Sequence, residues 1–268
     1  MPMRVREVDL GEIEFTGLEP ATRYEYQIID GETEELRVLY DGKALTQRLP
    51  GAEFSFAMIS DTHIGVNLDY SNQGDAALTA LISADLLADN PDFIIHLGDV
   101  LDYHQFGFNV APADPILPRW AYQNYRGAMG DTIGQLAHFS ALGNWDGENG
   151  DFTSEQIARS RQQRMLYLPN ASPDTYPQGG SPGQDYYAFT WGDATFVVLN
   201  VMLYTLMAHL LTGVNEYADD WTLGSTQLEW LEKTLSEATT KWKFTFIHHT
   251  VGGNGSSFAN AAYGRGGG

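Results

Sequence analysis

An aspartate and a histidine two positions apart, Asp61 and His63, directly follow an apolar run of the sequence. That run, residues 53–60, first alternates and then becomes apolar, which predicts a buried strand. Side chains just past a strand end face the crevice where α/β sheets hold ligands. Carboxylate and imidazole both bind divalent metals well, so the pair is a candidate metal site. Taken alone, it is more simply a polar turn.

The same arrangement recurs three more times along the chain. Further apolar runs cover residues 92–97, 137–142 and 243–247. They lead into metal-competent side chains at Gly98-Asp99, Gly143-Asn144 and His248-His249. Chance accounts for one or two such coincidences but poorly for four in this order. The repetition therefore favours one metal site shared by all four runs.

These four blocks resemble the calcineurin-like metallophosphoesterase family. Its motifs are D-x-H, G-D-x-x-D/Y, G-N-H-E/D, a strand that ends in His, and G-H-x-H. The corresponding blocks here are Asp61-Thr-His63, Gly98-Asp-Val-Leu-Asp102, Gly143-Asn-Trp-Asp146 and Ile247-His-His249. The resemblance covers roughly residues 51–268, and the order and spacing of the blocks make it specific.

The resemblance implies hydrolysis of phosphate esters at a dinuclear metal centre, by a metal-bound hydroxide. By family position, Asp61, His63 and a bridging Asp99 would hold one ion. Asn144 and His248, with the same Asp99, would hold the other. Oxygen and imidazole ligands suit Fe, Mn, Zn or Mg, and the sequence does not choose among them.

Two of the candidate ligands also have simpler structural interpretations. Asn144 also fits a Gly-Asn turn, and His248 also fits a satisfied core histidine. A core role is the one we assign to His96, inside the second apolar run. His138 and His209 are interpreted as structural or surface residues.

Two features depart from the family pattern. Trp145 stands where the third motif usually has His, and a tryptophan has no titrating proton to give a leaving group. His104 and His249 are the candidates to replace it as proton donor. The alternative, given equal weight, is that both histidines only support the metal ligands. Tyr103 comes one residue late for the metal-binding tyrosine of purple acid phosphatases, so that ligand is not assigned.

The Gly-His-x-His motif is the second departure, because it is absent before the chain stops at Gly268. Together with an incomplete segment at the N-terminus, this predicts a fragment cut at both ends. We therefore expect these residues alone to hydrolyse phosphate esters very poorly.

The incomplete segment is residues 1–50, where alternating runs at 12–16 and 23–28 predict antiparallel strands. The pattern Leu18-x-Pro-x-Thr-x-Tyr24 resembles the tyrosine corner of fibronectin type III sandwiches, where the ring packs inward and the hydroxyl bonds to upstream backbone. Purple acid phosphatases join such a sandwich directly to the catalytic domain. We expect a partial sandwich in 1–50 and the metallophosphoesterase domain in 51–268, with a short β-extension as the alternative.

The rest of the pattern predicts an α/β fold, an αββα sandwich of mixed sheets. Helical spacing marks residues 75–88, 119–129 and 154–165, and prolines mark a long loop at 106–118. Residues 186–190 and 194–199, separated by Gly192-Asp193, predict a hairpin. Thr226 and Glu229 fit a capping box for a last helix that carries Leu228, Leu231 and Leu235.

The composition limits the kinds of partner that the chain can bind. The chain of 268 residues has 15 basic and 35 acidic residues, a net charge of −20, which argues against nucleic-acid backbones. A phosphate-ester substrate would then need the local positive charge of metals. Without cysteine there is no disulfide, and no run of 18 apolar residues predicts a membrane span. No signal peptide is visible, and export is expected from the resemblance alone.

The leading functional hypothesis is a phosphomonoester or phosphodiester hydrolase. A non-catalytic binding module with a decayed site, as Trp145 hints, is the alternative. A cell-surface adhesion protein is a weaker third. Substrate and oligomeric state are left open.

Overall fold

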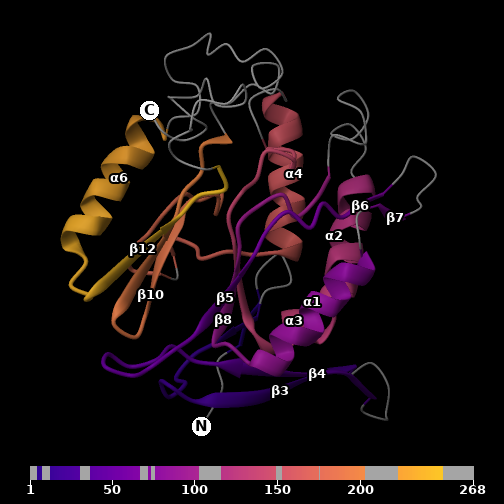
Figure 1. Ribbon diagram of the computed structural model, residues 1–268, viewed down its shortest axis with the longest axis horizontal. Coiled ribbons are helices and arrows are strands. Elements are labelled where there is room, and N and C mark those ends of the chain that lie inside the picture. Colours follow the sequence, from indigo (N-terminus) through magenta and orange to yellow (C-terminus); the bar gives the residue numbers. More distant parts are fainter. Residues whose placement is uncertain are drawn as a thin grey trace.

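A computed structural model describes residues 5–7, 13–30, 37–66, 72–73, 76–102, 116–148, 153–174, 176–202 and 223–249. Two sheets face each other in the middle of the molecule, and helices cover both outer sides (Figure 1). The predicted αββα arrangement is confirmed. In the described part, no helix is long and apolar enough to cross a bilayer.

The first sheet carries three of the four predicted blocks. Its order is β5 (Phe56–Ile59), β8 (Phe93–His96) and β9 (Ala137–Ser140), and all three strands are parallel. The helix α1 (Ala76–Asp89) connects the first two strands, as the sequence predicts. Because parallel strands end at the same edge, the residues after β5, β8 and β9 come together there.

The second sheet is mixed. The strands β10 (Tyr187–Trp191) and β11 (Ala194–Val198) form the predicted hairpin, and β12 (Trp242–Phe246) lies parallel to β11. The two sheets meet through aromatic rings, with the rings of Phe93 and Phe196 edge to face at 5.1 Å. This cluster fixes the distance between the sheets and so brings the end of β12 to the same edge as the first sheet.

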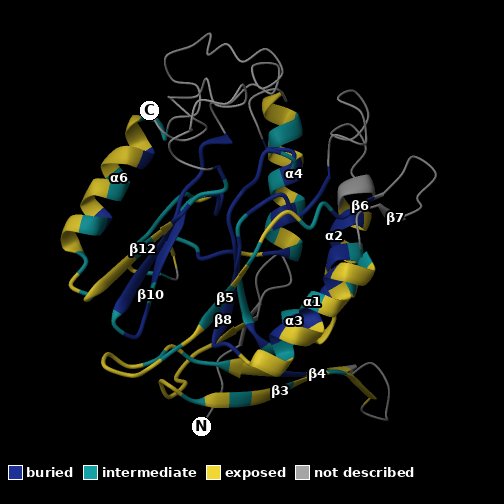
Figure 2. Ribbon diagram, in the orientation of Figure 1, coloured by how far each residue is buried: buried dark blue, intermediate teal, exposed yellow. Residues whose placement is uncertain are grey.

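Helices pack on both outer faces (Figure 2). The first sheet is covered by α1, α2 (Ile116–Met129) and α3 (Asp131–Gln135), which bury Leu86, Tyr122, Tyr125 and Met129 against Ile94. The second sheet is covered by α6 (Gly224–Glu237), and α4 (Ser154–Tyr167) packs beside α2.

Three expectations about these elements are wrong. The strand β5 is shorter than predicted and not buried, since it lies at the edge of its sheet and Met58 is 57% exposed. The capping box at Thr226 does not exist, because α6 already begins at Gly224 with no side-chain cap. Leu228 faces outward at 47% exposure. The predicted loop 106–118 gives way to helix at Ile116, and residues 103–115 lie outside the described part.

The N-terminal strands form antiparallel pairs, β1 (Val5–Glu7) with β2 (Ile13–Phe15) and β3 (Arg23–Asp30) with β4 (Arg37–Leu45). Tyr24 Oη accepts a hydrogen bond from the N–H of Glu19 at 2.9 Å, the upstream backbone contact predicted for its pattern. The fibronectin-like identity and the boundary at residue 50 stay predictions. Two further short strands, β6 (Gly65–Val66) and β7 (Asn72–Gln73), pair beside the first block.

Candidate metal centre

The five predicted metal ligands come from four different strand ends. Asp61 and His63 follow β5, Asp99 follows β8, Asn144 follows β9, and His248 follows β12. The structure brings all five together at one edge of the two sheets.

Unusual backbone conformations aim several of these side chains. Asp61, His63 and Asp99 have φ angles of 56°, 45° and 52°, in the left-handed region that non-glycine residues rarely adopt. Backbone bonds from Asp61 N–H to the Gly98 carbonyl and from His63 N–H to the Asp99 carbonyl, both 3.0 Å, hold the turn. Such strain costs about 1–3 kcal/mol per residue and clusters at functional sites.

Two glycines let the loops approach closely. A Cβ on Gly98 would lie 2.7 Å from the backbone nitrogen of Gly143. A Cβ on Gly143 would lie 2.1 Å from Oδ1 of Asp99. Any side chain at either position would push the Asp99 and Asn144 loops apart.

The first group of donor atoms consists of Asp61, His63 and Asp99. The Nε2 atom of His63 lies 3.5 Å from Oδ1 of Asp61 and 3.7 Å from Oδ2 of Asp99. One ligand atom from each residue lies within 4.8 Å of the other two. The side chains of Asp61 and His63 are 51% and 34% exposed, so this part of the centre is open to solvent.

The second group shares Asp99 with the first. The Nε2 atom of His248 lies 3.3 Å from Oδ2 of Asp99 and 3.1 Å from Oδ1 of Asn144. The same carboxylate oxygen of Asp99 therefore lies between His63 and His248. On the other side, Oδ1 of Asp99 accepts the backbone N–H of Trp145 at 2.7 Å.

The hydrogen bonds of His248 fix the orientation of its ring. Its Nδ1 lies 2.8 Å from the carbonyl of Leu97, which can only accept, so Nδ1 carries the proton. Its Nε2 then points into the centre, as in histidines that bind metals. Burial lowers the pKa of His248, but its hydrogen bond to Asp99 and the charge of Asp99 raise it to about 9.

Asp146 is a further candidate residue of the centre, to which the motif alone assigns no role. Its carboxylate accepts the backbone N–H groups of Asp99, Leu101 and Gly143 at 3.1, 3.0 and 2.8 Å. It is buried, and burial together with the charge of Asp99 raises its pKa to about 7. Its place at the end of the third motif was the signal that pointed to it.

A buried ion pair anchors the loop that follows β9 and carries Asn144 and Asp146. Glu148 accepts hydrogen bonds from Nε of Arg164 at 2.7 Å and from Nε of Arg161 at 3.1 Å. Arg164 also donates to the carbonyls of Gly183 and Gln184. The loop that carries Asn144 is thus tied to α4, and neither arginine was predicted to matter.

The remaining histidines fall into three groups. His96 is fully buried and contacts Thr62 and the N–H of Gly98, which confirms its interpretation as a core histidine. His249 is 4% exposed, with its ring 4.8 Å from that of His248. This burial favours a supporting position, and its catalytic role stays a prediction. His138, 2.9 Å from the Tyr125 hydroxyl through Nε2, is structural as well. His104 and His209 lie outside the described residues.

Trp145 lies against the first group of ligands. Its ring meets that of His63 edge to face at 5.4 Å, and it is only partly buried. The family's third-motif position is therefore filled here by an apolar ring beside a candidate ligand.

The chemistry of these donors fits metal ions. Donor atoms bound to one such ion lie about 3 Å apart, and the observed separations run from 3.1 to 3.7 Å. Among the described residues, Asp61 and Asp99 form ion pairs with histidines alone and with no Lys or Arg. The carboxylates thus gather without a Lys or Arg beside them, in a cluster that a divalent ion would stabilise.

Comparisons with known proteins concern the fold and the family. No curated protein matches the chain. A solved purple acid phosphatase, PPD1 from yellow lupin (Lupinus luteus), is similar over 89% of this chain and 38% of its own, with 14% identity and a TM-score of 0.57. A structure of PhoD is similar over 88% of this chain and 49% of its own, with 18% identity and a TM-score of 0.56.

The chain therefore spans less than half the length of either neighbour, and at these identities the likeness concerns the fold. The family model for calcineurin-like phosphoesterase matches residues 54–265, which include all four motif blocks. The chain belongs to the calcineurin-like phosphoesterase family.

Proposed function

We propose that this chain carries the centre of a dinuclear metal-dependent phosphoesterase. The observation that carries the proposal is the position of Asp99 Oδ2, 3.7 Å from Nε2 of His63 and 3.3 Å from Nε2 of His248. One carboxylate oxygen between two groups of donors is what a bridging ligand requires. Asp61 and His63 would hold the first ion with Asp99, and Asn144 and His248 the second. When bound, the ions would neutralise the phosphoryl charge and activate water for attack.

The protein's own part is to hold these ligands in place. Asp146 and the N–H of Trp145 fix the Asp99 loop, and the Leu97 carbonyl orients His248. Asn144 offers a neutral oxygen, so the second group binds an ion without adding negative charge. The open side at Asp61 and His63 leaves room for a phosphate ester to enter. His104 and His249 stay candidate proton donors, and the choice between mono- and diester is left to the assay.

Metal content per chain tests the proposal directly. Purified wild-type protein loaded with Mn, Zn or Fe is compared with Asp99→Ala and Asn144→Ala by elemental analysis. We expect Asp99→Ala to lose both ions and Asn144→Ala to lose mainly one. The exposed Asp174, outside the centre, supplies the control Asp174→Ala, which should keep the wild-type content.

Equal losses in the two site variants would contradict the bridging role of Asp99. A wild-type protein with no stoichiometric metal would instead support a binding module with a decayed site. Turnover of p-nitrophenyl phosphate and of its bis-ester, in the same preparations, then separates monoesterase from diesterase activity.

A further inference from the structure

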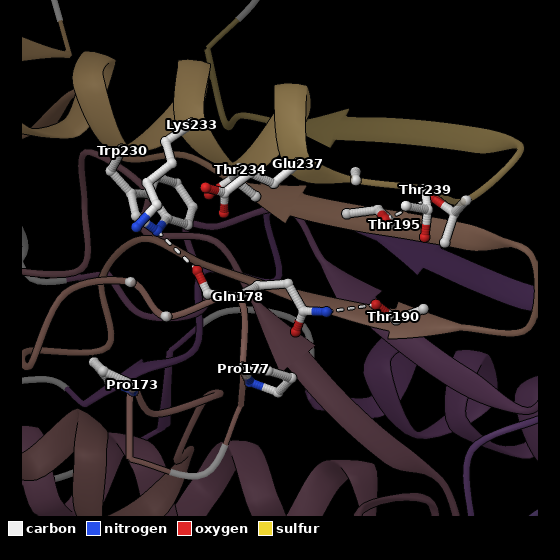
Figure 3. A pocket seen from close by; sticks show the side chains of 14 residues that line it. Pro173, Pro177, Gln178, Thr190, Thr195, Trp230, Lys233, Thr234, Glu237 and Thr239 are labelled. Carbon is white, nitrogen blue, oxygen red and sulfur yellow. Dashed lines mark hydrogen bonds between the residues drawn. The ribbon is translucent and has the colours of Figure 1, made fainter.

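A cavity of about 550 Å³ opens on the outer side of the second sheet (Figure 3). Its walls are α6, the loop residues Pro173 and 177–180, and the strands β10 and β11. The volume falls within the range of about 300–1,000 Å³ that small-molecule sites occupy. The cavity is large enough and well enough walled to hold a ligand.

This cavity is separate from the metal centre. Its floor includes Thr195 on β11, which pairs with Lys243 near the start of β12. The metal-centre residue His248 lies five residues further along, about 16 Å at 3.3 Å per residue. The cavity therefore lies toward the opposite end of the sheet, and no candidate metal ligand lines it.

The inner wall is polar but uncharged. Gln178 Nε2 donates to Thr190 Oγ1 at 2.6 Å, so the hydroxyl proton of Thr190 is left to donate. The other amide atom, Gln178 Oε1, is buried and has no hydrogen-bond partner in the described part of the chain. This oxygen has no accessible surface, so it does not face the cavity. The wall thus offers the Thr190 hydroxyl, which can donate one hydrogen bond and accept a further one.

Apolar surface lies next to these polar atoms. Trp230 projects from α6 toward the loop that carries Pro173 and Pro177 (Figure 3). The indole Nε1 donates to the carbonyl of Gln178 at 3.0 Å, which fixes both the ring and the loop. The loop can turn there because Gly179 has a φ of 67°, a conformation that glycine adopts without strain. The apolar wall is therefore held in place before any ligand binds.

Charges occur only at the exposed rim. Lys233 and Glu237 are one turn apart on α6 and both exposed, and they form no ion pair with each other in the described part. Their charges cancel, so the cavity itself favours neither an anion nor a cation. The net charge of −20 on the whole chain opposes anionic ligands further.

We propose that this cavity binds a neutral saccharide. A sugar hydroxyl both donates and accepts, which matches the Thr190 hydroxyl held by Gln178. The C–H face of a sugar ring is apolar and suits the surface of Trp230 and the prolines. Phosphate lacks an apolar face, and a purely apolar ligand would leave the Thr190 proton without an acceptor.

Calorimetric titration tests the proposal with glucose, galactose, mannose, cellobiose and maltose as probes. We expect at least one of them to bind in the millimolar range or tighter. Thr190→Val removes the hydroxyl at almost constant shape, and Gln178→Leu removes the amide. Each should weaken binding about tenfold. The matched control is Thr226→Val, on the exposed first turn of α6 outside the cavity, which should bind as wild type does.

Two further measurements make the outcome decisive. Equal melting temperatures of Thr190→Val and wild type would show that the lost affinity is local. Treatment with a chelator should leave sugar binding unchanged, because the cavity does not depend on the metal centre. The proposal is overturned if none of the five sugars binds, if Thr190→Val and Gln178→Leu bind as Thr226→Val does, or if inorganic phosphate binds there more tightly than any sugar.

Discussion

The carboxylate of Asp146 accepts the backbone N–H of Asp99 at 3.1 Å, so one buried acid positions another. The same carboxylate also holds the N–H groups of Leu101 and Gly143. Asp146 thereby joins the loop after β8 to the loop after β9. The two halves of the candidate centre depend on this one side chain for their spacing.

Replacing Asp146 by Asn should weaken metal binding without removing a ligand. The amide keeps the shape of the side chain but replaces one accepting oxygen with an NH₂ group, which cannot accept a backbone N–H. Mutating a residue that orients metal ligands typically lowers the affinity for the metal about 10–100-fold, and we expect a loss of that size. Competition with a fluorescent chelator measures it.

The control is Asp193→Asn. Asp193 also accepts a backbone N–H, that of Gly51 at 2.9 Å, but lies at the turn between β10 and β11, away from the centre. Its variant should bind metal as wild type does. If the two variants lose affinity equally, Asp146 has no special role at the centre.

Glu148→Gln should destabilise the whole domain. The variant leaves Arg164, which is 3% exposed, charged and without its carboxylate partner. Breaking a buried pair on one side costs about 3–5 kcal/mol of the free energy of unfolding. Urea denaturation monitored by circular dichroism measures that free energy.

The same part of the chain offers a matched comparison. Glu155 pairs with Arg159 at 2.6 Å on the exposed face of α4, where its side chain is 76% exposed. Glu155→Gln should change the free energy of unfolding by less than about 0.5 kcal/mol, because exposed helix pairs contribute little. A loss for Glu148→Gln no larger than this would mean that its buried pair does not anchor the loop.

The convergence of the candidate ligands could be predicted from sequence, because it follows from local rules. An apolar run predicts a strand, a helix between two runs predicts parallel strands, and parallel strands share an edge. That reasoning, with the order of the blocks along the chain, was enough to predict that Asp61, Asp99, Asn144 and His248 converge. The hairpin β10–β11 followed in the same way from its Gly192-Asp193 turn.

The errors concern features that depend on the rest of the fold. Whether Met58 is buried depends on the edge position of β5, which the run itself does not encode. The start of α6 at Gly224 depends on packing against the second sheet, and a Thr–Glu spacing is too common to decide it. Asp146 serves backbone N–H groups of two other loops, a contact between distant residues that periodicity does not reveal.

Acid should destabilise the protein through His138. Burial, with the nearby charge of Arg126, lowers the pKa of His138 to about 4, and the Tyr125 hydroxyl bonds to its neutral ring. The folded pKa lies below the ordinary value of 6.5, so the unfolded chain takes up the proton first as pH falls. Stability is therefore lost between pH 6.5 and about 4, by roughly 3 kcal/mol.

The variant His138→Gln keeps an acceptor for Tyr125 but cannot titrate. The difference in the free energy of unfolding between pH 7 and pH 4.5 should be smaller for this variant than for wild type. Comparing the two pH values within each protein cancels any effect of the substitution that is independent of pH. His96 is buried and its pKa is lowered in the same direction, so some acid sensitivity should persist. Identical pH differences would show that His138 is not held neutral.

Trp145 offers a test of how the leaving group departs, if the proposed activity is present. Its backbone N–H holds Asp99 whatever its side chain is, so substitution should leave that contact intact. Trp145→His would place a titratable imidazole beside His63, where the family usually has one.

A proton donor there speeds the loss of an alkoxide, whereas p-nitrophenolate leaves without help. General acids contribute about 100-fold or more, so kcat for an alkyl phosphate such as glycerol phosphate should rise strongly while kcat for p-nitrophenyl phosphate changes little. Trp145→Phe keeps an apolar ring and should raise neither rate. An equal change for both substrates in Trp145→His would place leaving-group protonation elsewhere in the protein.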